Sequence, residues 1–146
     1  MGDIQPVLIT PSGIFLMPNS PFSPAPAVGV LLVNLGSPDA PTPSAVRRYL
    51  AEFLADPRVI EAPRWFWLPI LHGVILRTRP RRSALAYASV WMPEGSPLMV
   101  YSRRQETALQ VALDQHVPGA YQVALAMRYG QPSVAAGLDR LQAMGC

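Results

Sequence analysis

The densest group of charged side chains is an arginine cluster in the middle of the chain. Residues 77–82 read "RTRPRR", which places four arginines in six positions. A guanidinium group is a planar fork that can bind a carboxylate through two parallel hydrogen bonds. The cluster therefore suits a ligand that carries carboxylates. A solvated basic loop is the alternative interpretation, and the segment is expected to be a loop in either case.

An uncharged apolar run directly precedes these arginines. It reads "WFWLPILHGVIL", from Trp65 to Leu76, with Arg64 before it. The run is too short for a membrane-spanning helix, which needs about 20 apolar residues. One interpretation is a core helix that is interrupted at Pro69 and Gly73. The other is an exposed apolar surface for a ligand or a membrane, with the flanking arginines reaching toward lipid headgroups.

Two loops that follow predicted strands carry further candidates. "LGSP" begins with Leu35 after the first strand, and "RY", which is Arg128 and Tyr129, follows the second. Ligands collect at the carboxyl ends of strands in open α/β sheets. The alternatives are plain core for Leu35 and a half-buried aromatic at a strand end for Tyr129. "LGSP" lacks the glycine spacing of a phosphate-binding loop, so no nucleotide site is predicted.

The histidines and the cysteine form no catalytic or metal-binding pattern. His72 interrupts the apolar run, and His116 ends an amphipathic helix, where it suits the helix terminus or solvent. Cys146 is the single cysteine, so an internal disulfide framework and a thiolate metal cage are excluded. No catalytic residue and no metal ligand is therefore predicted. One free cysteine fits a reducing cytoplasm.

Composition places the chain among globular proteins. Apolar residues make up 50% of the 146 positions and charged residues 14%, which allows a core and is too hydrophobic for general disorder. The net charge is only +3, and nucleic acid is not expected as a partner because it requires a denser basic face. Residues 1–27 hold six prolines and one charge, and they are predicted to form a disordered arm without an assigned function.

The elements that position these residues follow an α/β order. Continuous apolar runs at 28–34 and 121–127 are typical of strands that are buried on both faces of a parallel sheet. Thr42 and Pro43 predict the start of a helix between the two strands. Asp56 and the proline after it predict the end of that helix.

Three more helices are predicted downstream. A short helix is expected at 83–91, and a longer one follows "MPEGSP" with Tyr101 and Leu109 on its apolar side. A last helix begins at Pro132 and needs a sheet on which to pack, and two strands alone make a poor one. A third strand is therefore expected directly after Cys146, and the chain is expected to be a fragment of an α/β domain.

Three collinear segments resemble the ferrochelatase family. They are "GVLLVNLGSPDAPTPSAVRRYLAEFLADPRVIE", "YASVWMPEGSPLMVYSRRQ" and "ALAMRYGQPS", and the likeness runs from Val28 to the C-terminus. Ferrochelatase inserts Fe²⁺ into protoporphyrin IX in the last step of haem biosynthesis, and the apolar run before the arginines is similar to the bacterial type. The family has two similar Rossmann-like α/β domains, each a parallel sheet with helices on both faces. The resemblance implies that residues 28–146 are the N-terminal part of the first domain, which is incomplete.

The resemblance also implies which residues contact the porphyrin. Arg79 and Arg82 match positions that bind a propionate, and Ser96 adds a hydroxyl donor. The full set implied in this way is Leu35, Arg79, Arg82, Tyr87, Ser96, Arg128 and Tyr129. The apolar run becomes a lip over the porphyrin mouth that touches the membrane surface. The lip residues are Trp65, Phe66, Trp67, Leu68, Ile70 and Leu71.

The family's principal catalytic groups, a His and a Glu that face the ring centre, have no counterpart in this chain. The resemblance therefore implies a porphyrin-binding piece that is inactive alone. Fe²⁺ is a substrate of the full enzyme, and no permanently bound cofactor is expected. The expected location is the cytoplasm, with peripheral contact to the inner membrane. A non-catalytic porphyrin- or membrane-surface-binding module is the alternative, and protoporphyrin is not distinguished from coproporphyrin.

Overall fold

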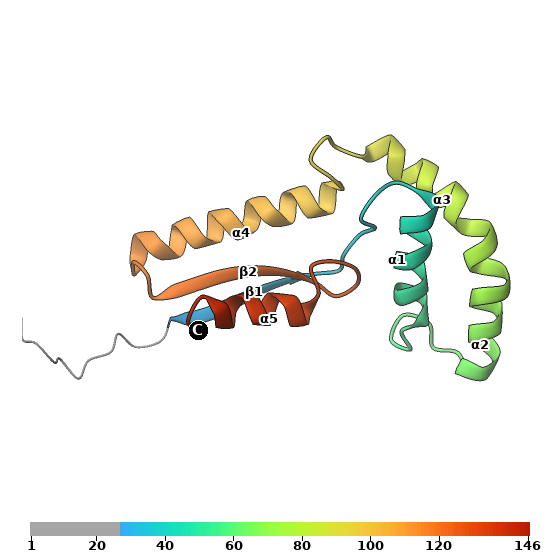
Figure 1. Ribbon diagram of the computed structural model, residues 1–146, viewed down its shortest axis with the longest axis horizontal. Coiled ribbons are helices and arrows are strands. Elements are labelled where there is room, and N and C mark those ends of the chain that lie inside the picture. The colour runs from blue at the N-terminus through green and yellow to red at the C-terminus, as the bar shows by residue number, and fades with distance from the viewer. Residues whose placement is uncertain (1–26) are drawn as a thin grey trace, which may run out of the picture.

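The computed structural model describes residues 27–146, so nearly all of the predicted arm at 1–27 lies outside the described residues. The described chain has two parts (Figure 1): a two-stranded parallel sheet between two helices, and a helical arm beside it. The elements in order are β1 (Val28–Asn34), α1 (Pro43–Ala55), α2 (Arg64–Ile70), the π-helical turn η1 (Leu71–Ile75), α3 (Leu76–Val90), α4 (Pro97–His116), β2 (Tyr121–Met127) and α5 (Val134–Ala143). This order confirms the predicted α/β fold class.

β1 and β2 lie side by side and run parallel, with Val28 opposite Tyr121 and Asn34 opposite Met127. Both strands have the bounds that the apolar runs predict. α4 lies on one side of the sheet and α5 on the other (Figure 1). Because parallel strands end at the same edge of a sheet, the loops after β1 and β2 meet there.

These two loops continue the pairing beyond the strands. The Arg128 backbone N–H donates to Asn34 O at 2.8 Å, and the Tyr129 N–H donates to Leu35 O at 3.0 Å. Gly36 follows with φ +107°, and a Cβ atom at this position would lie 1.8 Å from Tyr129 O. Only glycine fits this backbone conformation and this close approach. The fold therefore brings the strand-end candidates Leu35, Arg128 and Tyr129 together.

The two strands differ in burial. Every β2 residue from Val123 to Met127 is buried, whereas no β1 residue is. The prediction that both strands are buried on both faces is therefore wrong for β1. α4 packs on β2, and β1 forms the open edge of the sheet, so Val28 and Val33 keep 57% and 50% of their surface exposed.

α4 turns polar side chains toward the outer edge of β2. Gln110 Oε1 accepts a hydrogen bond from the Val123 N–H at 2.8 Å. Glu106 Oε1 accepts one from the Leu125 N–H at 3.1 Å. Tyr101, which was predicted on the inner side of this helix, is 55% exposed, so that part of the prediction is wrong. The backbone N–H groups of an edge strand need acceptors, and the inward face of α4 supplies them.

The apolar run before the arginines is helical throughout. α2 contains Pro69 and η1 contains Gly73, so neither residue ends the helix, and a π-helical turn takes the place of the expected interruption. Leu71 and Leu76 are buried and form a core cluster with Leu54 of α1. One side of the run is therefore core.

"RTRPRR" lies within α3, so the prediction that this segment is a loop is wrong. Leu76, Pro80 and Ala84 are buried at a spacing of four residues on the helix, which packs on α1. Burial of this stripe outweighs the backbone hydrogen bond that is lost at Pro80. The arginines around the stripe are consequently held on the exposed side of a helix.

Candidate functional site

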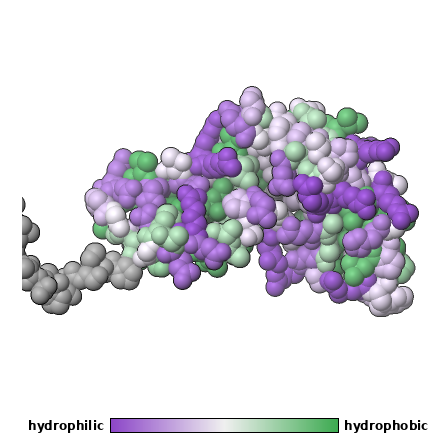
Figure 2. Space-filling model, viewed as in Figure 1, coloured by the Kyte–Doolittle hydropathy of each residue, from purple (hydrophilic) through white to green (hydrophobic). Residues whose placement is uncertain are grey.

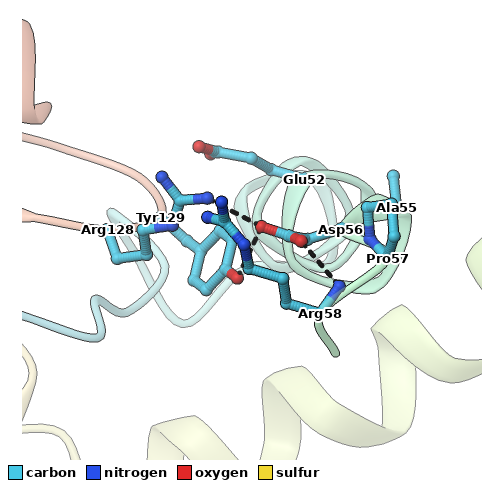
Figure 3. A pocket seen from close by; sticks show the side chains of 7 residues that line it. All are labelled: Glu52, Ala55, Asp56, Pro57, Arg58, Arg128 and Tyr129. Atoms are coloured by element: carbon cyan, nitrogen blue, oxygen red, sulfur yellow. Dashed lines mark hydrogen bonds and ion pairs between the residues drawn. The ribbon is translucent and has the colours of Figure 1, made fainter. Parts of the chain in front are cut away.

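A hollow of about 600 Å³ opens where the arm meets the loop after β2 (Figure 3). Its walls come from the last turn of α1, the turn that follows α1, and the residues directly after β2. The lining residues are Glu52, Ala55, Asp56, Pro57, Arg58, Arg128 and Tyr129. Two of them, Arg128 and Tyr129, are predicted porphyrin contacts.

The Asp56 carboxylate organises this hollow. Its Oδ2 accepts hydrogen bonds from Arg128 Nη2 at 2.8 Å and from Tyr129 Oη at 3.0 Å (Figure 3). Its Oδ1 accepts one from the Arg58 backbone N–H at 2.8 Å. These hydrogen bonds, that from Arg58 first, lower the pKa of Asp56 below its ordinary value. The contacts with Asp56 and Tyr129 raise the pKa of Arg128. Asp56 is thus an ionised carboxylate that is paired with a cation.

Arg128 and Tyr129 offer very different surfaces to a ligand. The Arg128 side chain is 47% exposed, whereas Tyr129 is only 6% exposed. The Tyr129 ring meets Phe53 edge-on, with ring centroids 5.1 Å apart. The next residue is also fixed, because the Gly130 N–H donates to Glu52 Oε2 at 2.9 Å. Arg128 is therefore the member of the pair that a large ligand can touch. The Tyr129 ring packs against the Arg128 guanidinium.

Aromatic rings of α1 extend from this hollow toward the loop after β1. Tyr49 stacks on Phe53 with centroids 5.8 Å apart and donates its hydroxyl to Gly36 O at 3.2 Å. Burial, followed by the nearby Tyr87 and Tyr129, raises the pKa of Tyr49 to about 12. Burial also raises the pKa of Tyr87. Tyr87, a predicted porphyrin contact, packs edge-on against Trp91, with ring centroids 6.4 Å apart.

A second hollow, of about 330 Å³, lies between the loop after β1 and the start of α4. Ser96 lines this hollow but is only 3% exposed. Its hydroxyl lies 2.6 Å from that of Ser37 and accepts a hydrogen bond from the Met99 N–H at 3.2 Å. Ser96 is thus the N-cap of α4. Its contact with a propionate stays a prediction.

The remaining predicted porphyrin contacts lie outside both hollows. Arg79 and Arg82 are exposed on α3, about one helical turn apart, and neither forms an ion pair with another of the residues 27–146. Leu35 is 50% exposed at the end of β1. Tyr87 and the two α3 arginines therefore do not line the hollow that contains Arg128.

The predicted lip residues differ in how far they are exposed to solvent. Trp65 is 81% exposed and Phe66 is 54% exposed, whereas Leu71 is fully buried. Three others are half-buried: Trp67, Leu68 and Ile70. Figure 2 shows hydrophobic surface bordered by hydrophilic side chains at the end of the molecule that carries α2. Within the described part of the chain, no helix is long and apolar enough to cross a membrane.

Asp56 is the site residue that sequence patterns missed, since they identify it only as the end of a helix. One signal was available. The C-terminal end of a helix carries partial negative charge, so a carboxylate there is unfavourable unless a cation lies nearby. Sequence spacing does not identify that cation, because Arg128 lies 72 residues further along the chain.

Comparison with known proteins assigns this arrangement to a family. The family model described as Ferrochelatase matches residues 27–146. The chain is 58% identical to the ferrochelatase of Thioalkalivibrio sulfidiphilus over an aligned region of 118 residues, and this region covers 81% of the chain and 32% of the relative. It is 57% identical over 119 residues to the ferrochelatase of Bordetella pertussis, which covers 82% of this chain and 33% of the relative. It is 60% identical over 116 residues to the coproporphyrin III ferrochelatase of Symbiobacterium thermophilum, which covers 80% of this chain and 35% of the relative.

The chain spans about a third of the length of these curated relatives. The matched region contains both hollows, the helical arm and both strands. The resemblance of the three sequence segments is thereby confirmed. The chain belongs to the ferrochelatase family.

Proposed function

We propose that this chain supplies a porphyrin-gripping part of a ferrochelatase, a lyase that inserts Fe²⁺ into protoporphyrin IX in the last step of haem biosynthesis. The observation that carries the proposal is the family match across residues 27–146, which includes the site built on Asp56, Arg128 and Tyr129. The iron is a substrate of the whole enzyme, and no resident cofactor is needed for the part described here.

The chemistry of the substrate explains the residue types. A porphyrin is a flat, largely apolar disc with carboxylates on its edge, and it needs apolar surface, cations and a base for the two pyrrole protons that leave. Trp65 and Phe66 offer exposed aromatic surface, and Arg79 and Arg82 offer exposed guanidinium groups. Arg128 adds a third guanidinium at the carboxyl ends of the strands. These groups suit binding of the disc and its carboxylates.

We assign no residue to the role of the base. The pKa of Tyr49 is about 12 and that of Tyr87 is raised, so neither phenol accepts a proton as a phenolate near neutral pH. Asp56 is already paired with Arg128. Residues 27–146 also contain no group of three or more His, Cys, Asp or Glu side chains that could hold a metal ion. We therefore expect the 146-residue chain to bind porphyrin without inserting a metal.

A porphyrin titration tests this function. The chain is expected to shift the Soret band of protoporphyrin IX and to show no insertion of Zn²⁺ or Fe²⁺. Replacement of both Arg79 and Arg82 by Gln should raise the dissociation constant at least about tenfold, because a hydrogen bond to a charged group contributes about 1.5–3 kcal/mol. Arg47→Gln, at an exposed position of α1, is the matched control and should leave the affinity unchanged.

The absence of a Soret shift would contradict the binding role, and metal insertion at an appreciable rate would contradict the assignment of no base. A parallel titration with coproporphyrin III, which the name of the Symbiobacterium thermophilum relative specifies, compares the two candidate porphyrins.

A membrane-surface-binding module without catalysis is the second candidate. The observation that favours it is the 81% exposure of Trp65, next to the exposed Arg64. Aromatic and basic residues together suit the interface between headgroups and acyl chains. Such contact would place the protein at the cytoplasmic surface of the inner membrane. Binding to anionic vesicles without any binding of porphyrin would favour this candidate over the first.

A further inference from the structure

The end of α1 carries a carboxylate in a position that helix stability alone does not explain. Asp56 is the C-cap residue of α1, where the partial negative charge of the helix disfavours an anion. The local turn uses only Oδ1, which accepts from the Arg58 N–H. Oδ2 is free of that turn and accepts from Arg128 and Tyr129. A serine at this position could satisfy the turn, so the second oxygen and the charge serve the distant pair.

We propose that Asp56 is a positioning residue for porphyrin binding, which holds the Arg128 guanidinium and the Tyr129 hydroxyl in the arrangement that receives the ligand. This inference rests on the proposed porphyrin-binding function. Asp56 itself need not touch the porphyrin, because its side chain is only 13% exposed while that of Arg128 is 47% exposed.

Arg128 is held from two sides. Its Nη2 donates to Asp56 Oδ2 at 2.8 Å, and its guanidinium carbon lies 5.5 Å from the centre of the Tyr129 ring. A free arginine side chain samples many rotamers, and a ligand that orders it loses part of the binding free energy. An arginine that is already ordered by Asp56 avoids this loss. Arg128 donates no other side-chain hydrogen bond within residues 27–146, so its remaining N–H groups are available at the rim of the hollow.

The same turn of α1 also holds the lip helix. Trp67 Nε1 donates to Leu54 O at 2.7 Å, and Arg64 Nη1 donates to Ala55 O at 3.2 Å. Leu54, Ala55 and Asp56 therefore bind, in sequence order, two side chains of α2 and the pair after β2. This turn is the junction between the aromatic lip and the strand-end arginine. Of these three consecutive residues Asp56 has the charged side chain, and Glu52 of the same helix binds the Gly130 N–H beside it.

The first test measures the order of Arg128 directly. In an isotope-labelled chain, the Nε–Hε signal of Arg128 is expected to report an ordered side chain, and Asp56→Asn is expected to make it as mobile as that of the exposed Arg47. Asp56→Ser keeps an acceptor for the local turn and should give the same result. It provides the measurement if the Asn variant folds poorly. Asp139→Asn on α5 is the matched control and should leave the signal unchanged. An Arg128 signal that stays ordered in both Asp56 variants overturns the proposal.

The second test is a double-mutant cycle on the affinity for protoporphyrin IX. Asp56→Asn should weaken binding about tenfold in the natural background and less than about twofold when Arg128 is already Gln, because coupled residues are not additive. Equal losses of affinity in both backgrounds would indicate a purely structural role for Asp56 and would contradict the proposal. If the natural chain does not bind porphyrin at all, the proposed function fails, while the order of Arg128 still decides the role of Asp56.

Discussion

Asp56 Oδ2 lies 2.8 Å from Arg128 Nη2, so the residue that ends α1 is ion-paired with the residue that follows β2. Exposed ion pairs contribute little to the free energy of unfolding, typically about 0–1 kcal/mol. The importance of this pair lies in what it joins. It fixes the helical arm, with its aromatic lip, to the edge of the sheet where the strand-end candidates meet.

Protonation of Asp56 should weaken this junction. Its folded-state pKa is lowered, so the stabilisation is fully present above the ordinary pKa of an aspartate, about 3.9, and is lost as the pH falls through the folded value. We expect Asp56→Asn to lower the free energy of unfolding at neutral pH, and the difference from the natural chain to vanish in strong acid. Urea unfolding at a series of pH values measures this. A difference of the same size at every pH would contradict it, and Asp139→Asn serves as the control.

Gly36→Ala should disrupt the contact between the two strand-end loops. The new Cβ atom would lie 1.8 Å from Tyr129 O on a backbone with φ +107°. The conformation alone costs about 1–2 kcal/mol for a residue with a side chain, and the clash adds to this cost. We expect a loss of at least about 2 kcal/mol in the free energy of unfolding, measured by urea denaturation.

Gly73→Ala is the matched control for this substitution. A Cβ atom at Gly73 meets no atom within 4 Å, and the residue lies in the helical turn η1. Alanine there should be neutral or should stabilise the chain by about 0.4–1 kcal/mol. Equal destabilisation by both substitutions would show that the strand-end contact is not the cause.

Gln110→Ala should open the outer edge of β2. The substitution removes the acceptor of the Val123 N–H and should cost about 1 kcal/mol in the free energy of unfolding. Hydrogen exchange of the Val123 amide should also become faster, while that of Ala124, which lies within the paired strands, should change less. Gln105→Ala, at an exposed position of the same helix, is the control. Unchanged exchange at Val123 would contradict the edge-closing role of α4.

Combined replacement of Trp65 and Phe66 by Ala tests the proposed membrane contact. Both side chains are exposed on α2 and are candidates for insertion between lipid headgroups. We expect the affinity for anionic vesicles to fall about tenfold or more, because each large aromatic can bury about 150–250 Å² of surface. Sedimentation with vesicles measures this. Val111→Ala removes an exposed apolar side chain from α4 and should have no effect, and an equal loss in this control would point to non-specific adsorption.

Local sequence patterns predicted the elements that depend on local interactions. The apolar runs gave both strands their observed bounds, and Thr42 with Pro43 gave the start of α1. In several places where packing between elements decided the outcome, the sequence pattern gave the wrong prediction. Pro80 lies inside α3 because its helix face is buried against α1, and β1 is exposed because it forms the open edge of the sheet.

The sequence by itself determined the α/β class, the family and the candidates at the strand ends, since each rests on runs or motifs that are contiguous in the chain. Only the tertiary structure decided that Asp56 pairs with Arg128, that Tyr129 is buried beneath this pair, and that Ser96 is buried against Ser37. The physical reason is that burial and charge pairing depend on distances in space. Residues 72 positions apart become partners only when the arm and the sheet are packed together.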